Sequence, residues 1–498
     1  MGEFETRKSK LQALRDKGID PFHVRWRLGE RLDLDGIRRR FEAEGDKPFP
    51  ARIAGRVTAI RVMGKAAFID LRDASGKLQL FVRKNDVGDP AWSLLEHLDL
   101  GDFLGAEGEV NRTKMGEVSL FAKTLELTGK ALLSLPAKWH GLADTEIRYR
   151  QRYLDLIANP ESTMIFRKRV AILEAIRRTL SERGFLEVET PMLQSIPGGA
   201  AARPFVTHHN ALGEDLFLRI APELYLKRLL VGGFTRIFEI NRNFRNEGIS
   251  VRHNPEFTML EAYQAYADYN VMADLFESVL TGVARDLGVL GKSIRFNDRD
   301  LKLEPDAAAG RLRFRRAFLP ELWQTHLGED IHLSLKGKGF DSAGLRALAE
   351  RKGVAHGPEV PDAKVFDALF ERYIEAHLPA PTFVFDHPTA ITPLAKCKPG
   401  DESLVERFEF FYQGLEFANA YTELNDPLDQ RGRFEEQAKQ KAGGHAEAEL
   451  VDEDFVQAME HGMPPTGGIG FGIDRLVMLF TDTTTIREVI LFPTLKPE

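Results

Sequence analysis

The chain of 498 residues lacks several features that would mark common protein classes. It has one cysteine, Cys397, so no internal disulfide can form and a reducing compartment, the cytoplasm, is expected. No run is apolar enough to span a bilayer, so no membrane partner is expected, and the acidic N-terminus is not typical of a signal peptide. A Gly-Lys-Ser/Thr phosphate loop and the dinucleotide-binding glycine spacing are also missing.

The length and ordinary composition indicate a globular protein of two or three domains. The net charge of -7 does not by itself indicate a nucleic-acid-binding protein. The charge is unevenly distributed, however, because residues 1–150 carry a small excess of Lys and Arg while the remainder is acidic. RNA is therefore expected to bind at the N-terminal end.

Hydrophobic patterning divides the chain into segments. Residues 1–45 are expected to be helical. Residues 46–135 contain five short alternating runs with a helix-like stretch at 90–98, and the runs lie at 53–62, 67–71, 78–82, 103–110 and 118–127. This order is typical of an OB-fold barrel, which commonly binds single-stranded nucleic acid. Residues 136–498 are expected to form a catalytic domain, with a mainly helical insertion at 296–365.

One short segment, residues 244–257, gathers groups suited to a nucleotide, after a strand-like run at 237–240. The guanidinium of Arg245 can bind a phosphate or carboxylate through two N–H groups. Phe257 offers a flat face for a base. A surface hairpin with ion pairs is the more ordinary interpretation of a single Arg-x-Glu pattern.

A second segment far along the chain favours the nucleotide interpretation. Gly468, Gly470 and Gly472 alternate at period two, and Arg475 follows at the start of an apolar helical run. Glycines along a strand let a ligand or another backbone approach closely, and an anion is favoured near a helix start.

These two segments resemble motifs 2 and 3 of class II aminoacyl-tRNA synthetases, and residues 159–191 are similar to motif 1. There, Asn159 and Pro160 begin a predicted helix that Gly184 ends, and a strand-like run follows. In that family this unit forms the homodimer interface, whereas an amphipathic helix packed inside its own monomer is the commoner meaning of the pattern. The resemblance implies an α+β fold with an antiparallel sheet flanked by helices.

Residues 197–200, 220–228 and 419–426 resemble lysyl-tRNA synthetases in particular, and the resemblance covers essentially the whole chain. Ala418 and Ala420 stand where many bacterial members have glycine, and Tyr421 stands where those have phenylalanine, which indicates a subgroup. The resemblance implies ATP-dependent activation of L-lysine to lysyl-adenylate and transfer to the 3′ end of tRNA-Lys.

The resemblance also implies the ATP-binding residues. They are Arg245, Glu247, His253, Asn254, Phe257 and Arg475. Arg245 and Arg475 are expected to be catalytic, because an ionised carboxylate attacks ATP without a general base and catalysis must come from positioning and charge neutralisation. Glu409 and Glu416 match the ligands of Mg²⁺, a hard cation that prefers oxygen.

Lysine carries a cation at each end of a flexible chain, so a pocket needs a separate carboxylate for each. By resemblance Glu223 takes the α-ammonium and Glu423 the ε-ammonium. The implied lysine-binding residues are Gly199, Glu223, Arg245, Tyr263, Asn419, Tyr421 and Glu423. In the barrel, the implied anticodon-binding residues are Arg61, Phe68 and Gln79, with Phe68 stacking on a base, although a strand phenylalanine is usually core.

Three alternatives stay open from the sequence. A synthetase paralogue that lysylates a protein would lack the N-terminal barrel. Aspartyl and asparaginyl enzymes share the barrel and motifs, but their substrates do not call for Glu423. A catalytically silent RNA-binding or regulatory relative could lose the catalytic and metal-binding groups, all of which are present: Arg245, Arg475, Glu409 and Glu416.

Overall fold

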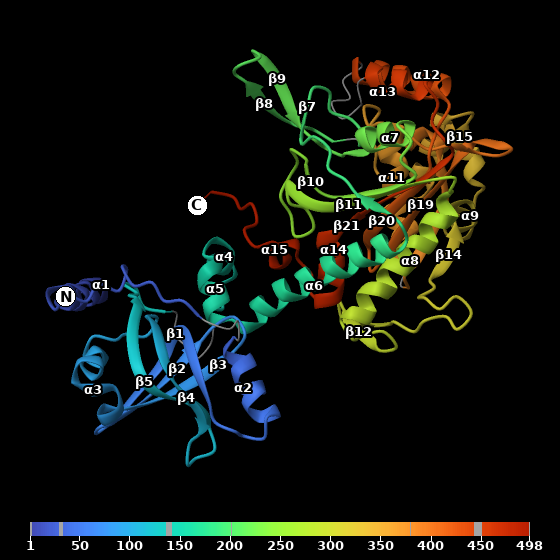
Figure 1. Ribbon diagram of the computed structural model, residues 1–498. Helices are drawn as coiled ribbons and strands as arrows, with labels where there is room; N and C mark the ends of the chain where they lie inside the picture. Colours follow the sequence, from blue (N-terminus) through green and yellow to red (C-terminus); the bar gives the residue numbers. More distant parts are fainter. Residues whose placement is uncertain are drawn as a thin grey trace. The chain divides into compact units, whose positions relative to one another are not determined.

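The computed structural model describes residues 2–28, 33–135, 142–200, 202–378, 380–442 and 451–497. The chain forms two compact units, Met1–Thr163 and Met164–Glu498 (Figure 1). Among the described residues, no helix combines the length and apolarity needed to cross a membrane.

The first unit is built on a barrel of five strands. They are β1 (Phe49–Met63), β2 (Ala66–Arg72), β3 (Lys77–Arg83), β4 (Phe103–Arg112) and β5 (Val118–Gly129). The strands pair in the order β1-β2-β3-β5-β4, and β4 pairs with β1 to close the barrel. Ile69, Leu80 and Leu120 point inward and are fully buried, because alternate residues of each strand face the interior. The five predicted runs and the OB-fold are confirmed.

Short helices complete this unit. They are α1 (Glu3–Asp16), α2 (Leu34–Ala43), α3 (Lys84–Ser93), η1 (Leu94–Glu96), α4 (Thr145–Arg150) and α5 (Arg152–Ala158). Helix α2 contributes Leu34, Ile37 and Phe41 to the barrel core. Helix α3 begins directly after β3, earlier than the helix expected at 90–98, and the extended Gly88 (φ 80°) interrupts it before Pro90.

The second unit is built on a nine-stranded sheet. The strands are β6 (Leu186–Glu187), β10 (Arg236–Phe244), β11 (Glu256–Ala265), β14 (Arg315–Phe318), β17 (Thr382–Pro388), β18 (Cys397–Lys398), β19 (Asp401–Tyr412), β20 (Leu415–Thr422) and β21 (Thr466–Gly472). Their order is β14-β17-β19-β20-β21-β11-β10-β6, and β18 pairs with β19. Only the end strands β14 and β6 pair in parallel, so the predicted antiparallel sheet is confirmed.

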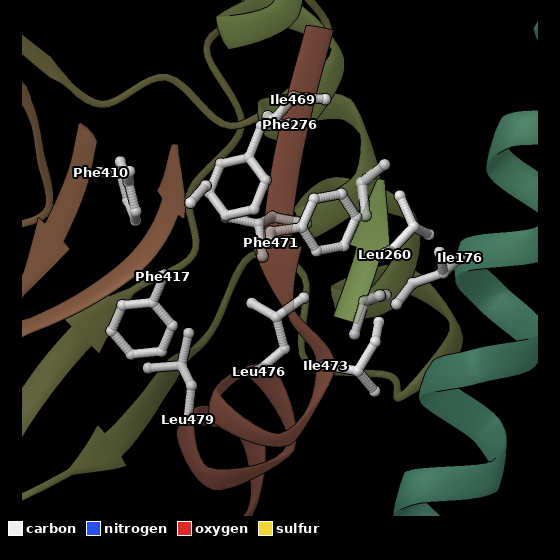
Figure 2. Packing of buried hydrophobic residues seen from close by; sticks show 14 of the residues in the cluster. Ile176, Leu260, Phe276, Phe410, Phe417, Ile469, Phe471, Ile473, Leu476 and Leu479 are labelled. Carbon is white, nitrogen blue, oxygen red and sulfur yellow. The ribbon is translucent and has the colours of Figure 1, made fainter. Parts of the chain in front are cut away.

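Helices cover one face of this sheet: α6 (Pro160–Glu182), α8 (Tyr269–Asp286) and α14 (Ile473–Thr481). Figure 2 shows Ile176, Phe276 and Leu476 from these helices packed with the strand residues Leu260 and Phe471. Because strand side chains alternate between faces, the residues between these apolar positions lie on the opposite face.

The remaining elements of this unit are β7 (Leu193–Gln194), β8 (Phe205–His209), β9 (Glu214–Leu218), α7 (Glu223–Val231), β12 (Ser293–Phe296), β13 (Arg299–Lys302), α9 (Leu319–Leu327), η2 (Ile331–Ser334), β15 (Leu335–Lys336), β16 (Gly339–Phe340), α10 (Ser342–Arg351), α11 (Asp362–Tyr373), η3 (Glu375–His377), η4 (Thr389–Ile391), α12 (Pro427–Ala442), α13 (Glu453–Glu460) and α15 (Ile486–Val489). The segment 296–365, expected as a mainly helical insertion, contains helices but also several strands. One of these strands, β14, belongs to the central sheet through its pairing with β17.

Candidate functional site

The predicted site residues gather on the face of the central sheet opposite the apolar core. Two rows of neighbouring residues cross β19, β20, β21 and β11 on this face. One row is Arg407, Tyr421, Gly468 and Tyr263, and the other is Glu409, Asn419, Gly470 and Glu261. Strand β21 contributes only glycine to these rows, so the centre of the face carries no side chain of its own.

The two central glycines serve different purposes. A Cβ on Gly468 would lie 1.9 Å from Glu423 Oε1 and 2.6 Å from Tyr263 Cε1, which no alanine could tolerate without rearrangement. A Cβ on Gly470 would meet Met259 Cε at 3.4 Å and Glu261 Cγ at 3.6 Å, which are ordinary contacts. Gly468 therefore makes room for the protein's own side chains.

Glu223 and Glu423 meet at a single ammonium group. Lys227, one helical turn after Glu223 on α7, places its Nζ 2.6 Å from Glu223 Oε1 and 2.5 Å from Glu423 Oε2. The exposed fractions are 6% for Glu223, 1% for Glu423 and 0% for Lys227. Gly199 adopts a φ of 83° against this group, and a Cβ there would lie 3.0 Å from Glu223 Cβ. The two acids are thus joined by a cation of the chain itself.

The electrostatics of this pocket favour a cationic ligand. Burial raises the pKa of Glu423 to about 8, although Lys227 opposes the shift. Among the described residues, neither carboxylate oxygen of Glu423 has a hydrogen-bond partner of ordinary geometry; Oε2 has its ion pair with Lys227, and Oε1 is open. Tyr263 donates its hydroxyl hydrogen to Glu261 Oε2 at 3.0 Å, and burial together with Glu223 raises the pKa of Glu261 to about 8. A buried carboxylate is costly unless a cation pairs with it.

Arg407 organises the neighbouring part of the face. Its Nε donates to Asn419 Oδ1 at 3.1 Å, and its guanidinium lies 5.6 Å from the ring centre of Tyr421. It also pairs with Glu409 through a short contact and donates to Thr392 Oγ1 at 2.8 Å. Two predicted lysine-binding residues and one predicted metal ligand are therefore held by one buried arginine.

Arg245 begins the loop between β10 and β11 and has no ion-pair partner within 4.0 Å among the described residues. Its Nε is shielded from solvent and also lacks a hydrogen-bond partner there. Burial lowers the pKa of Arg245, while Glu247, Glu416 and Glu261 oppose the shift. The guanidinium lies 5.1 Å from the ring centre of Phe257. A guanidinium in this state is suited to bind an anion.

The loop after Arg245 is held at two points by the C-terminal segment. Asn254 accepts a hydrogen bond at Oδ1 from the Thr494 backbone N–H at 3.1 Å and donates from Nδ2 to Glu256 O at 2.6 Å. The Ile486 N–H donates to Val251 O at 2.9 Å. The side chain of Asn254 is therefore engaged in holding the loop.

The other predicted loop residues are more exposed. Glu247 and His253 lie at the surface, and His253 Nδ1 is 3.1 Å from Ser250 Oγ. Partial burial, followed by the charge of Arg475, lowers the pKa of His253. The neutral form of the ring is therefore favoured.

Glu416 and Arg475 bring the third motif into the same site. Arg475 donates to the backbone carbonyl of Glu416, and its guanidinium lies 3.7 Å from Glu416 Oε2. Burial and the charge of Glu409 raise the pKa of Glu416. The described residues contain no cluster of three or more His, Cys, Asp or Glu suited to a metal ion. Two mutually repelling carboxylates nevertheless fit Mg²⁺, which often takes one or two carboxylates together with water and substrate phosphates.

The barrel carries an aromatic ladder on its outer surface. Phe68, Phe81 and Phe121 are neighbours across β2, β3 and β5. The rings of Phe68 and Phe81 stack with centres 5.0 Å apart, and Phe121 meets Phe81 edge-on at 5.1 Å. All three rings are partly exposed, so Phe68 is not a core residue.

The two polar residues predicted beside Phe68 have partners within the barrel. Arg61 lies beside Phe68 and bonds Asp70 Oδ1 at 3.3 Å. Gln79 is buried and accepts at Oε1 from the Ser119 hydroxyl at 3.0 Å. Both side chains are therefore already oriented by the fold.

The sequence prediction did not include five residues that the structure adds: Lys227, Glu261, Arg407, Phe81 and Phe121. Glu261 and Phe81 lie two residues from Tyr263 and Gln79, so strand alternation could have indicated them. Lys227 follows Glu223 at helical spacing, which is a weaker signal. Strand alternation places Arg407 on the same face as Glu409, two residues away, but it does not show that the two side chains pair.

Comparison with known proteins gives consistent matches. Residues 144–496 match the family model described as tRNA synthetases class II (D, K and N), and residues 51–128 match an OB-fold nucleic acid binding domain. The chain is 49% identical to a lysine–tRNA ligase of Pelotomaculum thermopropionicum, over 99% of this chain and 94% of that protein. It is 49% identical to that of Moorella thermoacetica, over 99% and 97%. It is 48% identical to that of Enterococcus faecalis, over 98% and 96%.

Proposed function

The chain belongs to the lysine–tRNA ligases among the class II synthetases, and from this premise we propose how its residues carry out the reaction. The enzyme joins the carboxylate of L-lysine to the α-phosphate of ATP, releasing pyrophosphate, and transfers the lysyl group to the 3′ end of tRNA-Lys. Two observations carry the proposal: the open oxygen of buried Glu423, and the guanidinium of Arg245, which has no ion-pair partner among the described residues. A carboxylate and a guanidinium together are suited to a ligand that carries a cationic group for Glu423 and an anionic group for Arg245.

For ATP, we propose that Arg245 binds the lysine carboxylate and the α-phosphate, which reduces their repulsion as they approach. Phe257 stacks on adenine, and Glu247 and Asn254 complete the nucleotide site, Asn254 by holding the loop. Arg475 and His253 bind the γ-phosphate. No side chain acts as a general base, since the attacking carboxylate is already ionised.

For lysine, Glu223 binds the α-ammonium and Glu423 binds the ε-ammonium through its open Oε1. Tyr263 and Tyr421 line the path of the aliphatic chain, and Asn419, held by Arg407, faces the same pocket. Gly199 lets the substrate approach close to Glu223.

Glu409 and Glu416 would hold Mg²⁺. The ion supplies charge neutralisation for the phosphate oxygens when it is bound. Arg407 and Arg475 orient these two carboxylates, and they limit the repulsion between them before nucleotide binds.

In the barrel, Phe68 stacks on an anticodon base while Arg61 and Gln79 donate hydrogen bonds. The second copy of the chain would pack on α6 and β6, where Met164, Val170 and Leu186 are about half exposed. Cys397 is free, which fits the cytoplasm as the compartment.

The lysine pocket is tested by Glu423→Gln. The variant keeps the shape of the side chain but cannot neutralise the ε-ammonium, so kcat/KM for lysine in ATP–pyrophosphate exchange should fall about 10²–10³-fold. The KM for ATP should change little. Near-normal lysine-dependent exchange in this variant would refute the assignment of Glu423.

The function as a whole is tested by ATP–pyrophosphate exchange with each standard amino acid. A signal with lysine alone, followed by charging of tRNA-Lys, is expected. A signal with aspartate or asparagine would place the chain with those synthetases. Lysylation of a protein but not of tRNA would favour the paralogue, and no exchange would favour the silent relative.

A further inference from the structure

We propose that Lys227 is a positioning residue for lysine recognition: its ammonium fixes the side chains of Glu223 and Glu423 in place and supplies a buried positive charge beside both, leaving Oε1 of Glu423 for the substrate. The inference rests on the proposed lysine pocket and deepens it. Lys227 itself does not touch the substrate in this proposal.

Each of the two carboxylates pairs with Lys227 through only one of its oxygens. Glu223 uses Oε1 and Glu423 uses Oε2 to pair with the Lys227 ammonium. The other oxygen of Glu423, Oε1, lies over Gly468 and has no hydrogen-bond partner among the described residues. One buried cation thus orients two acids from distant parts of the chain, on α7 and directly after β20, and Oε1 of Glu423 stays available to a ligand.

The charges of the pocket explain why such a cation is needed. Glu223 lies close to both Glu261 and Glu423, and among the described residues the other ionisable groups that interact with Glu423 are Lys227, Tyr263 and Tyr421. Lys227 is the only cation in this set, and the two acids raise its pKa. Without it, repulsion and burial would keep Glu423 protonated, and a protonated carboxyl binds an ammonium ion poorly.

The burial of Lys227 argues against a role as a mere surface ion pair. Its side chain is fully buried in the middle of α7, while its sequence neighbour Arg228 is partly exposed and pairs with Asp452 at 2.6 Å. Substitutions of the two residues therefore provide a comparison: each removes one cation from the same helix, with two ion pairs lost at Lys227 and one at Arg228, and only Lys227 contacts the pocket.

The experiment compares Lys227→Met, Lys227→Gln, Lys227→Arg and the control Arg228→Met in lysine-dependent ATP–pyrophosphate exchange. In Lys227→Met and Lys227→Gln the KM for lysine should rise about 10-fold or more at pH 7.5, with kcat and the KM for ATP within about threefold of the starting enzyme. Lys227→Arg should restore much of the loss, because it keeps the charge. Arg228→Met should leave the lysine KM unchanged.

The pH profile separates positioning from simple structural support. The KM for lysine should fall as the pH rises and Glu423 ionises, with a midpoint near the pKa of Glu423, about 8. In Lys227→Gln this midpoint should move above about pH 9, because the positive charge of Lys227 no longer favours the ionised carboxylate. The ionisation of lysine itself is the same for all variants, so the difference between profiles reports the enzyme. A merely structural lysine would lower the melting temperature and leave this midpoint in place.

Several outcomes would overturn the inference. An unchanged lysine KM and pH midpoint in folded Lys227→Met would do so, and a lower lysine KM would show instead that Lys227 competes with the substrate. If neither uncharged variant folds with lysine and ATP present, Lys227 is a folding residue and the proposal is rejected. In each case exchange by the unaltered enzyme still reports separately on the proposed function.

Discussion

At the scale of single residues, the site depends on the absence of a side chain at Gly468. Glu423 Oε1 and the Tyr263 ring occupy the space in which a Cβ would stand. Both are residues of the proposed lysine pocket, so Gly468 is explained by the protein's own packing rather than by a flat ligand alone.

Gly468→Ala should therefore displace Glu423 and Tyr263. We expect the free energy of unfolding to fall by about 1–3 kcal/mol through overpacking, and the KM for lysine to rise more than the KM for ATP. Denaturant melts and exchange kinetics measure the two effects. Gly470→Ala is the control, since its Cβ would make only ordinary contacts with the protein.

Ionisation of the buried acids predicts a pH dependence of stability. The pKa values of Glu261 and Glu423 are each about 8 in the fold and raised from 4.5, so the folded state binds protons that the unfolded state has released. The stability this provides is fully present below about pH 4.5 and is lost as pH rises through 8.

From pH 6 to 9 the melting temperature of the ligand-free protein should accordingly fall, as measured by scanning fluorimetry. Lysine should raise the melting temperature by a larger amount at the alkaline end, because its ammonium pairs with the ionised Glu423. A stabilisation by lysine that is constant over this range would contradict this interpretation of Glu423.

At the scale of elements, alternation explains how much of the fold could be predicted. The barrel strands and the strand-like run at 237–240 follow clear period-two patterns, and the structure confirms them, the run as part of β10; β11 was not predicted as a strand. Strand β14 has only four residues, which is too short for an alternating pattern to be recognised. The sequence therefore did not predict this edge strand of the central sheet. Within the site, residues tied to motifs were predicted, whereas Lys227 acts through a long-range ion pair with Glu423 that no local pattern encodes. Arg407 pairs with Glu409 two residues along the same strand, but no motif drew attention to it.

The aromatic ladder predicts that Phe81 on β3 and Phe121 on β5 contribute to tRNA binding together with Phe68. Phe121→Ala should raise the KM for tRNA-Lys about 5–50-fold, since one base–aromatic stack contributes about 1–3 kcal/mol. ATP–pyrophosphate exchange does not use the anticodon and should be unaffected. Phe49→Ala serves as the contrasting variant, because Phe49 is a buried barrel residue whose loss should lower stability. If Phe121→Ala leaves tRNA charging unchanged, base stacking is confined to Phe68 and Phe81.

At the scale of the whole molecule, α6 leaves an apolar surface open. Ile176 and Leu180 are fully buried against the sheet, whereas Val170 on the same helix is 54% exposed. Exposed apolar residues along one helix and the following strand are typical of an interface. We therefore expect two copies of the chain to associate through this surface.

Val170→Asp tests that expectation. A charge buried at the interface should weaken the dimer, so light scattering at low micromolar concentration should show the mass of one chain. Glu174→Gln is a milder control on the same helix. If Val170→Asp stays dimeric with an unchanged dissociation profile, the interface lies elsewhere.

The hydrogen bonds from Ile486 and Thr494 to Val251 and Asn254 have a practical consequence. Proteolytic clipping ahead of Ile486 would untether the segment that carries Arg245, even though none of the lost residues belongs to the proposed binding sites. Such a nicked preparation should lose affinity for ATP while still recognising lysine, and intact mass is worth checking before any kinetic difference is assigned to the pocket.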